Sequence, residues 1–162
     1  MLSSDIIERI KNIDSNYVIS GSQAVMIYVG HDIRECNDLD IHLKKEVSYE
    51  DISKELNVAV DISYETIPYQ IYKGIRLIEL EKLLANKLNR INIEFRNKDL
   101  YDLYFLLDLK YSESVLVKYL SFKNFNLIIN ENENVDFSEF YFEIEIEECV
   151  QKIKNNLHKI YS

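Results

Sequence analysis

The fold is decided by the stretch Asp38-Leu39-Asp40-Ile41-His42-Leu43, which follows Tyr17-Val18-Ile19-Ser20-Gly21-Ser22 along the chain. Side chains alternate between the two faces of a strand, so residues 38–43 predict a strand with its acids on one face and its aliphatic side chains on the other. Residues 17–19 predict a shorter strand that ends at Gly21. Residues 22–29 predict a helix closed by Gly30.

These two stretches carry complementary chemistry. Asp38 and Asp40 repel each other unless a cation lies between them, and hard oxygen ligands suit Mg²⁺. Gly21-Ser22 opens a helix, whose backbone N–H groups can hold phosphate. Each feature alone is commonly structural, since Asp-x-Asp often marks the solvent face of a strand and Gly-Ser a turn with an N-cap. Together they predict a metal site beside a phosphate site.

A third carboxylate follows from the next strand. Residues 57–64 predict a strand with Val58, Val60 and Ile62 on one face and Asp61 on the other. If this strand pairs beside residues 38–43, Asp61 joins Asp38 and Asp40, as a two-metal site requires. His42 shares their face, and we interpret it as a polar neighbour because Mg²⁺ prefers oxygen ligands.

The remaining pattern alternates helices and strands. It predicts helices near residues 5–10, 45–56, 79–93, 99–110, 115–120 and 147–160, a strand at 75–77, and one or two strands within 125–146. Within the last segment, Glu143, Glu145 and Glu147 alternate with isoleucines, which predicts a half-buried strand with its acids outward. The fold class is therefore α/β (α+β), a small mixed sheet with packed helices.

Two charged side chains lie on apolar helix faces. On a helical wheel, Lys87 falls within the leucine stripe of residues 79–93, where it must snorkel or meet an anion. Asp99 falls on the packed side of the next helix, and Asp102 lies at its edge. As an alternative, Asp99 is an N-cap or first-turn acid that complements the helix dipole. A polar pocket between the two helices is expected.

The formal net charge of −9 argues against nucleic acid as a partner, but the charge is uneven. Residues 131–148 hold acids and no base, whereas residues 73–98 are basic and could meet a triphosphate or an RNA end. The first apolar residues are interrupted by charges, and no apolar run approaches the roughly 20 residues that cross a bilayer. Cys36 and Cys149 match no metal or redox spacing. We expect a reduced, cytoplasmic protein that does not bind membranes.

These residues together resemble the AbiEii-type nucleotidyltransferases of the polymerase-beta-like superfamily, which include toxins of type IV toxin–antitoxin systems. The resemblance covers about residues 16–108 and rests on Gly21-Ser22, on the Arg34–Asp40 segment, on Lys87 and on the segment 96–103. It implies that Asp38 and Asp40 are catalytic metal ligands and that Gly21, Ser22 and Arg34 bind the nucleotide. Lys87 and Asp99 would be later catalytic or nucleotide-contacting motifs.

The resulting hypothesis is a Mg²⁺-dependent enzyme with a two-metal site formed by Asp38, Asp40 and Asp61. It would transfer a nucleoside monophosphate from an NTP to RNA, with a tRNA 3′ end as one such acceptor, in a toxin-like role. Alternatives are transfer onto a partner protein, such as a cognate antitoxin, or a degenerate member that binds nucleotide or protein without catalysis. We assign residues 1–110 to the nucleotidyltransferase core and 111–162 to a C-terminal helical and strand appendage of the same compact unit.

Overall fold

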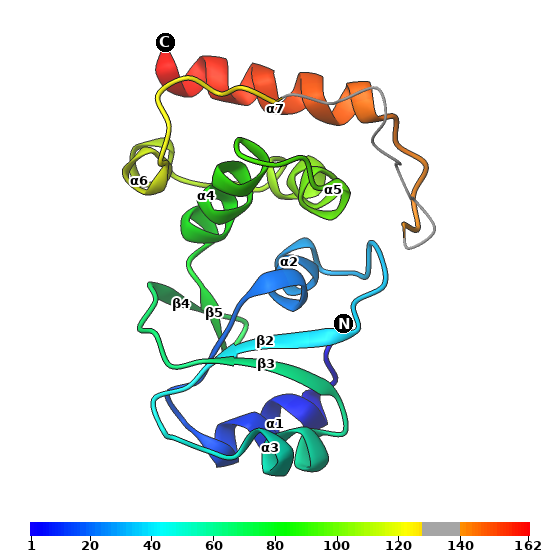
Figure 1. Cartoon of the computed structure of the whole chain (residues 1–162), viewed down its shortest axis with the longest axis vertical. Helices are drawn as coiled ribbons and strands as arrows, with labels where there is room; N and C mark the ends of the chain where they lie inside the picture. The colour runs from blue at the N-terminus through cyan, green and yellow to red at the C-terminus, as the bar shows by residue number, and fades with distance from the viewer. Residues whose placement is uncertain (128–139) are drawn as a thin grey trace. The chain divides into compact units, whose positions relative to one another are not determined.

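A computed structural model describes residues 1–127 and 140–162 of the chain. The chain forms two compact units, Met1–Leu80 and Glu81–Ser162. The boundary between the units falls inside the segment 1–110 that the sequence assigns to the core. The predicted α/β class is confirmed, because a mixed five-stranded sheet is combined with helices (Figure 1).

The sheet of the first unit has the strand order β3-β2-β1-β5-β4. Its strands are β1 (Val18–Ile19), β2 (Asp38–His42), β3 (Ala59–Ser63), β4 (Tyr69–Tyr72) and β5 (Ile75–Ile78). β2 runs parallel to β3 and antiparallel to β1, and β5 runs parallel to β1 and antiparallel to β4. The predicted pairing of the Asp61 strand beside the Asp38–Asp40 strand is thereby confirmed.

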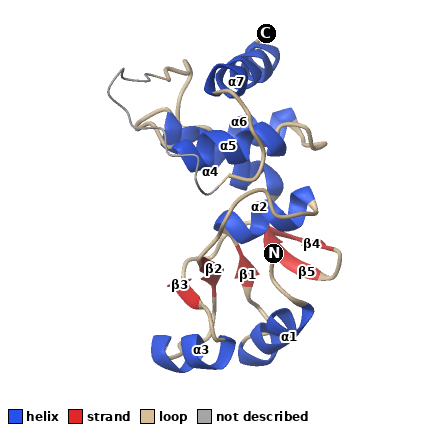
Figure 2. Ribbon diagram, turned by 90° about the vertical axis from the view of Figure 1, so that its right-hand side faces the viewer, coloured by secondary structure: helices blue, strands red, loops and turns tan. Residues whose placement is uncertain are grey.

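Three helices cover this sheet. α2 (Gly21–Val29) lies on one face, and α1 (Ser4–Ile13) and α3 (Tyr49–Leu56) lie on the opposite face (Figures 1 and 2). Leu39 and Ile41 of β2 are buried, as the alternating pattern predicts. α2 ends at Gly30, which adopts φ +92° and closes the helix in the left-handed conformation. This strand–helix–strand order places the amino end of α2 beside β2.

The sequence pattern predicts only one of the two strands in the hairpin of β4 and β5. β5 matches the expected strand at 75–77, but the pattern does not single out β4. Tyr69 and Ile71 are exposed, because β4 is an edge strand covered on one side only. Lys73 and Gly74 both have positive φ and form the tight turn that pairs β4 with β5.

The second unit is helical. Its helices are α4 (Leu80–Ile91), α5 (Asn97–Leu106), α6 (Glu113–Tyr119) and α7 (Ile146–Tyr161), with Leu80 belonging to the first unit. α7 packs against α5 and α6. The buried core includes Leu84, Leu88, Leu103 and Ile153. Each helix overlaps the one predicted for that part of the chain.

The strand predicted for Glu143–Glu147 is wrong. No strand forms in the described residues of the segment 125–146, and α7 begins at Ile146. Glu147 and Glu148 lie in the first turn of α7, where acids offset the helix dipole, so a local preference for a helix start prevails over the alternation. Residues 128–139 of this segment lie outside the described residues. Within the described chain, no helix is long and apolar enough to cross a membrane.

Candidate functional site

The predicted acids lie together on the α2 face of the sheet. Asp40 of β2 is the direct register partner of Asp61 in the parallel strand β3, and Asp38 pairs with Ala59. Residues in register on parallel strands point to the same face, so Asp38, Asp40 and Asp61 share it. Asp38 and Asp61 are exposed, and Asp40 is half-buried. The sheet therefore gathers the three predicted carboxylates on a face that solvent and ligands can reach.

Asp40 lies against the first residue of α2. A Cβ atom added to Gly21 would lie 1.8 Å from Asp40 Oδ2, and Gly21 has φ +58°. Only glycine satisfies both conditions without strain, since it lacks the Cβ and adopts positive φ freely. The strand thus brings a carboxylate to the amino end of α2, where positive partial charge accumulates.

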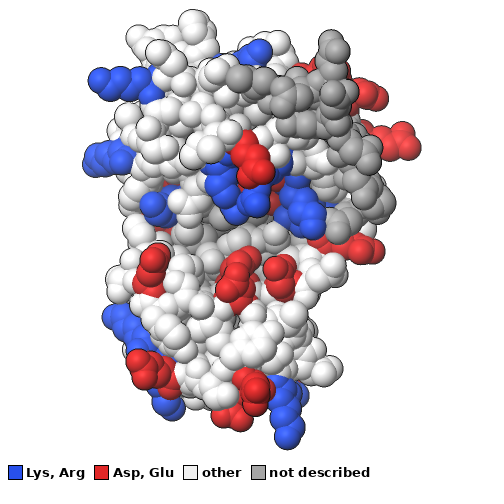
Figure 3. Space-filling model, in the orientation of Figure 1, with Lys and Arg blue, Asp and Glu red and all other residues white. Residues whose placement is uncertain are grey.

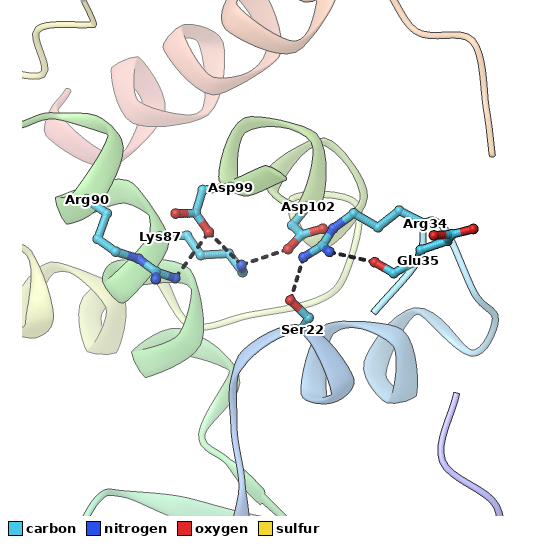
Figure 4. Close-up of polar contacts among 7 residues, drawn as sticks. All are labelled: Ser22, Arg34, Glu35, Lys87, Arg90, Asp99 and Asp102. Atoms are coloured by element: carbon cyan, nitrogen blue, oxygen red, sulfur yellow. Dashed lines mark hydrogen bonds and ion pairs between the residues drawn. The ribbon is translucent and has the colours of Figure 1, made fainter. Parts of the chain in front are cut away.

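Arg34 holds the second residue of α2. Its guanidinium donates to Ser22 Oγ and to the carbonyl oxygen of Glu35 at 3.0 Å (Figure 4). Arg34 is 3% exposed. The hydrogen bond from the Arg34 side chain fixes the Ser22 hydroxyl at the helix start. The family resemblance implies that Arg34 binds the nucleotide, and that role stays a prediction.

Cys36 lies between the two predicted halves of the site. Its thiol donates to the carbonyl oxygen of Asp38 at 3.2 Å. Burial raises the pKa of the Cys36 thiol, and the neighbouring charge of Asp38 raises it further, while Arg34 and hydrogen bonds oppose them. The residue is therefore a neutral thiol at neutral pH, in keeping with a packing role.

His42 contacts its neighbours on the sheet through both ring nitrogens. Nε2 lies 3.1 Å from Ser20 Oγ, and Nδ1 lies 3.2 Å from the carbonyl oxygen of Glu65. These contacts agree with the interpretation of His42 as a polar neighbour. The pattern does not single out Ser20, although its place directly before the helix start is a signal for an N-cap residue.

The donor chemistry of the α2 face fits Mg²⁺, since three carboxylates share that face and Mg²⁺ takes oxygen ligands. The described residues nevertheless contain no group of three or more His, Cys, Asp or Glu side chains placed to hold a metal ion. The strand register thus places the three acids on one face, but their carboxylates are not close enough together to coordinate one metal ion as they stand. Their role as metal ligands stays a prediction.

Lys87 and the two predicted acids of α5 meet inside the second unit. Lys87 Nζ donates to Asp99 Oδ1 at 2.8 Å and to Asp102 Oδ2 at 2.7 Å, and all three side chains are almost fully buried (Figure 4). Arg90 donates to Asp99 Oδ1 at 3.1 Å from a half-exposed position. In the structure, the anions that Lys87 meets are these carboxylates.

One oxygen of this network stays unpaired. Asp99 Oδ2 is buried and has no hydrogen-bond partner among the described residues. An unsatisfied buried acceptor is costly, which makes it unusual in a purely structural ion pair. The catalytic or nucleotide-contacting role predicted for Lys87 and Asp99 stays a prediction.

Basic side chains of the second unit gather around α4 and α5 on the face that Figure 3 shows. Arg90 and Arg96 are each about half-exposed, and Arg96 Nε lies 3.8 Å from Glu94 Oε2. Ile93 between them is 84% exposed. The basic character predicted for residues 73–98 is therefore a surface feature here, whereas Lys87 is buried.

Comparison with known proteins relates the chain to a family and to two solved structures. A family model described as aminoglycoside-2''-adenylyltransferase matches residues 3–86, which span α1 to the middle of α4. The match includes Gly21, Ser22, Arg34 and all three predicted metal ligands. No curated protein matches the chain.

Two crystal structures from Helicobacter pylori are similar in fold. JHP933 has a TM-score of 0.56 and 17% sequence identity, over 99% of this chain and 94% of the other. A protein described as a "putative nucleotidyltransferase" has a TM-score of 0.56 and 16% identity, over 99% and 96%. Neither comparison identifies the AbiEii type. Because the family model covers more than half of the chain, the chain belongs to the aminoglycoside-2''-adenylyltransferase family of nucleotidyltransferases.

Proposed function

We propose that the protein transfers a nucleoside monophosphate from an NTP to a hydroxyl group of an RNA acceptor, with release of pyrophosphate. The observation that carries the proposal is that the Asp40 carboxylate lies directly against Gly21. This contact brings a predicted metal ligand to a helix start that can bind phosphate. Family membership supports the reaction class. The RNA acceptor rests on the resemblance to AbiEii-type enzymes and on the basic surface around Arg90 and Arg96.

Asp38, Asp40 and Asp61 would hold Mg²⁺, which supplies neutralisation of the triphosphate charge when bound. The first turn of α2 would donate backbone N–H groups to phosphate oxygens, with the Ser22 hydroxyl oriented by Arg34. Asp61, the exposed register partner of Asp40, would accept the proton of the acceptor hydroxyl or serve as a metal ligand.

The transfer step conserves atoms and charge. The acceptor oxygen attacks the α-phosphorus, and a new P–O bond forms. The bond from the α-phosphorus to the oxygen that links it to the β-phosphorus breaks, and pyrophosphate leaves with that oxygen and the electron pair of the bond. The hydroxyl proton passes to a carboxylate. No covalent enzyme intermediate is needed.

An aminoglycoside is a second candidate acceptor, favoured by the description of the matching family. It offers the same nucleophile, a sugar hydroxyl. The same transfer reaction could therefore use any of three acceptors: a tRNA 3′ end, a hydroxyl of a partner protein or an aminoglycoside. The identity of the acceptor would determine the biological role, including that of a toxin.

The experiment incubates the protein and Mg²⁺ with each of the four α-³²P-labelled NTPs. Separate reactions contain total RNA, purified tRNA, a lysate cleared of nucleic acid, or an aminoglycoside. We expect label on RNA, and its loss in EDTA and in Asp38→Asn. Label on the aminoglycoside alone would replace RNA by the second candidate, and label on protein would identify a protein acceptor. Absence of label in every reaction would contradict the proposed function.

A further inference from the structure

We propose that His42 is a positioning residue that holds the Ser20 hydroxyl away from the amino end of α2, so that this helix start can take phosphate. The inference rests on the proposed function. It concerns residues of the first unit only. Neither residue belongs to the predicted metal ligands or to the predicted nucleotide contacts.

Ser20 occupies the N-cap position of α2 without capping it. A serine at this position ordinarily accepts a hydrogen bond from a backbone N–H of the first turn. Ser20 makes no such bond. Ser3, the N-cap residue of α1, does so, because its Oγ accepts from the backbone N–H of Ile6 at 3.3 Å. Ser48 and Ser112, the N-cap residues of α3 and α6, make no such bond either, so the inference rests on the contact of the Ser20 hydroxyl with His42 and not on the missing cap alone.

The strand register delivers His42 to Ser20. Val18 pairs with His42, and Ser20 donates its backbone N–H to the carbonyl oxygen of Asp40 at 3.0 Å. Ser20 and His42 are therefore diagonal neighbours on one face of the antiparallel pair, within side-chain reach. The distance of 3.1 Å between His42 Nε2 and Ser20 Oγ is that of a hydrogen bond.

The second ring nitrogen defines the direction of this bond. His42 Nδ1 lies 3.2 Å from the carbonyl oxygen of Glu65, which can only accept. In the neutral ring Nδ1 therefore carries the proton, and Nε2 accepts from the Ser20 hydroxyl. The imidazole thus engages the serine side chain and turns it from the helix axis.

α2 is left without a cap from its own sequence. Every other helix in the described residues carries an acid in its first turn, and α2 carries none. An acid or a capping hydroxyl there would compete with an incoming phosphate for the first-turn N–H groups. The first turn of α2 carries neither of these, and the only carboxylate that the described contacts place at this helix start is Asp40 of β2, the predicted metal ligand.

Inorganic pyrophosphate with Mg²⁺ is the probe, because it carries the part common to all NTPs. Isothermal calorimetry compares the wild type with His42→Ala, Ser20→Ala and the double variant. Released from His42, the Ser20 hydroxyl should cap α2, so His42→Ala should weaken binding about fivefold to tenfold. Removing the hydroxyl as well should restore wild-type affinity. His42→Gln, whose amide oxygen can accept from Ser20, should also retain it.

Melting temperatures provide a readout that needs no ligand. Ser20→Ala should change little in the wild type, where the hydroxyl caps nothing. In the His42→Ala background it should remove a newly formed cap and lower the melting temperature by about 2–4 °C. Additive melting temperatures would overturn the inference, whatever the ligand does.

The two failures are distinguishable. If His42→Ala weakens binding and Ser20→Ala does not restore it, His42 acts directly on the ligand and the positioning role is wrong. If the wild type binds no pyrophosphate, the proposed function fails at this site. The non-additive melting temperatures would then still establish that His42 controls the Ser20 hydroxyl.

Discussion

The Asp40 carboxylate lies so close to Gly21 that no residue with a Cβ atom fits at position 21. The Asp40 carboxylate fills the place that a Cβ at Gly21 would take, with 1.8 Å between that position and Oδ2. The positive φ of Gly21 is a second, independent demand for glycine. A side chain at position 21 would therefore displace the Asp40 carboxylate, so the helix start and the acidic strand depend on the glycine between them.

Gly21→Ala should cost more stability than positive φ alone explains. Left-handed backbone strain accounts for about 1–2 kcal/mol, and displacement of the Asp40 side chain should add to it. Urea denaturation measures the free energy of unfolding, and the transfer assay measures activity. Activity should fall sharply, because Asp40 is a predicted metal ligand.

Gly74→Ala is the matched control for this variant. Gly74 also has positive φ, at +79°, but a Cβ there would have no atom within 4 Å. It should lose only the strain energy and keep full activity. Equal losses of stability in the two variants would show that the contact with Asp40 has no energetic weight.

Local pattern predicted this part of the site well. Alternation in residues 38–43 and 57–64 assigned the acids to one face, because a strand with one buried face can satisfy its aliphatic residues in only one register. The glycine at 30 marked a helix end through its backbone freedom. The reason for glycine at 21 was not predictable, since it depends on a side chain from another element.

Elsewhere, the sequence pattern did not predict the contacts that one helix or strand makes with another. A helical wheel placed Lys87 and Asp99 on packed faces, but it could not show that both carboxylates of α5 bind one ammonium group. β4 depends on its partner strand rather than on a buried face of its own. At Glu143–Glu147, two isoleucines alternate over too few residues to outweigh the first-turn preference of Glu147 and Glu148 for a helix.

Asp38→Asn and Asp40→Asn should each abolish transfer and leave the fold intact. Both side chains lie off the core, and neutralising one removes repulsion between carboxylates that share a face. In EDTA, the melting temperature should therefore stay level or rise. Asp51→Asn, an exposed acid of α3 on the other side of the sheet, is the control and should retain activity. Full transfer by Asp38→Asn would exclude it as a metal ligand.

Lys87→Met should destabilise the second unit strongly. Two buried carboxylates would lose their shared cation, and leaving a buried charge unpaired typically costs about 3–5 kcal/mol. Thermal and urea unfolding measure the loss. Lys82→Met is the control in the same helix, where the ammonium lies 5.1 Å from the ring centroid of Tyr119, and should cost about 1 kcal/mol or less.

The double variant Lys87→Met/Asp102→Leu separates a structural role from a phosphate contact. It removes one cation and one anion and leaves Asp99 with Arg90, so stability should recover by a large part of the single-variant loss. If Lys87→Met instead keeps the wild-type melting temperature and loses only NTP affinity, the lysine acts on the nucleotide as the family resemblance implies.

Asp14 should make the stability of the first unit depend on acid pH. This buried residue follows α1, and its carboxylate accepts backbone hydrogen bonds from Asn16 at 2.8 Å, Lys44 at 2.7 Å and Lys45 at 2.9 Å. Burial by itself would raise the pKa of Asp14, but these hydrogen bonds outweigh it, with help from Arg76, and lower the pKa below its ordinary value of 3.8. The folded state therefore favours the charged carboxylate.

The sign of the dependence follows from linkage. A group whose folded pKa is lowered contributes stability that is present above the unfolded pKa, near 4, and is lost as the pH falls through the folded pKa. Asp14→Asn turns one acceptor oxygen into a donor facing backbone N–H groups, so it should cost about 1–3 kcal/mol at pH 7. The difference in the free energy of unfolding between the wild type and Asp14→Asn should become smaller below pH 4, because the wild-type carboxylate is then protonated. Urea unfolding of both proteins at pH 7 and pH 3 measures this difference, and a gap that is the same at both pH values would show that the carboxylate charge is not what stabilises this turn.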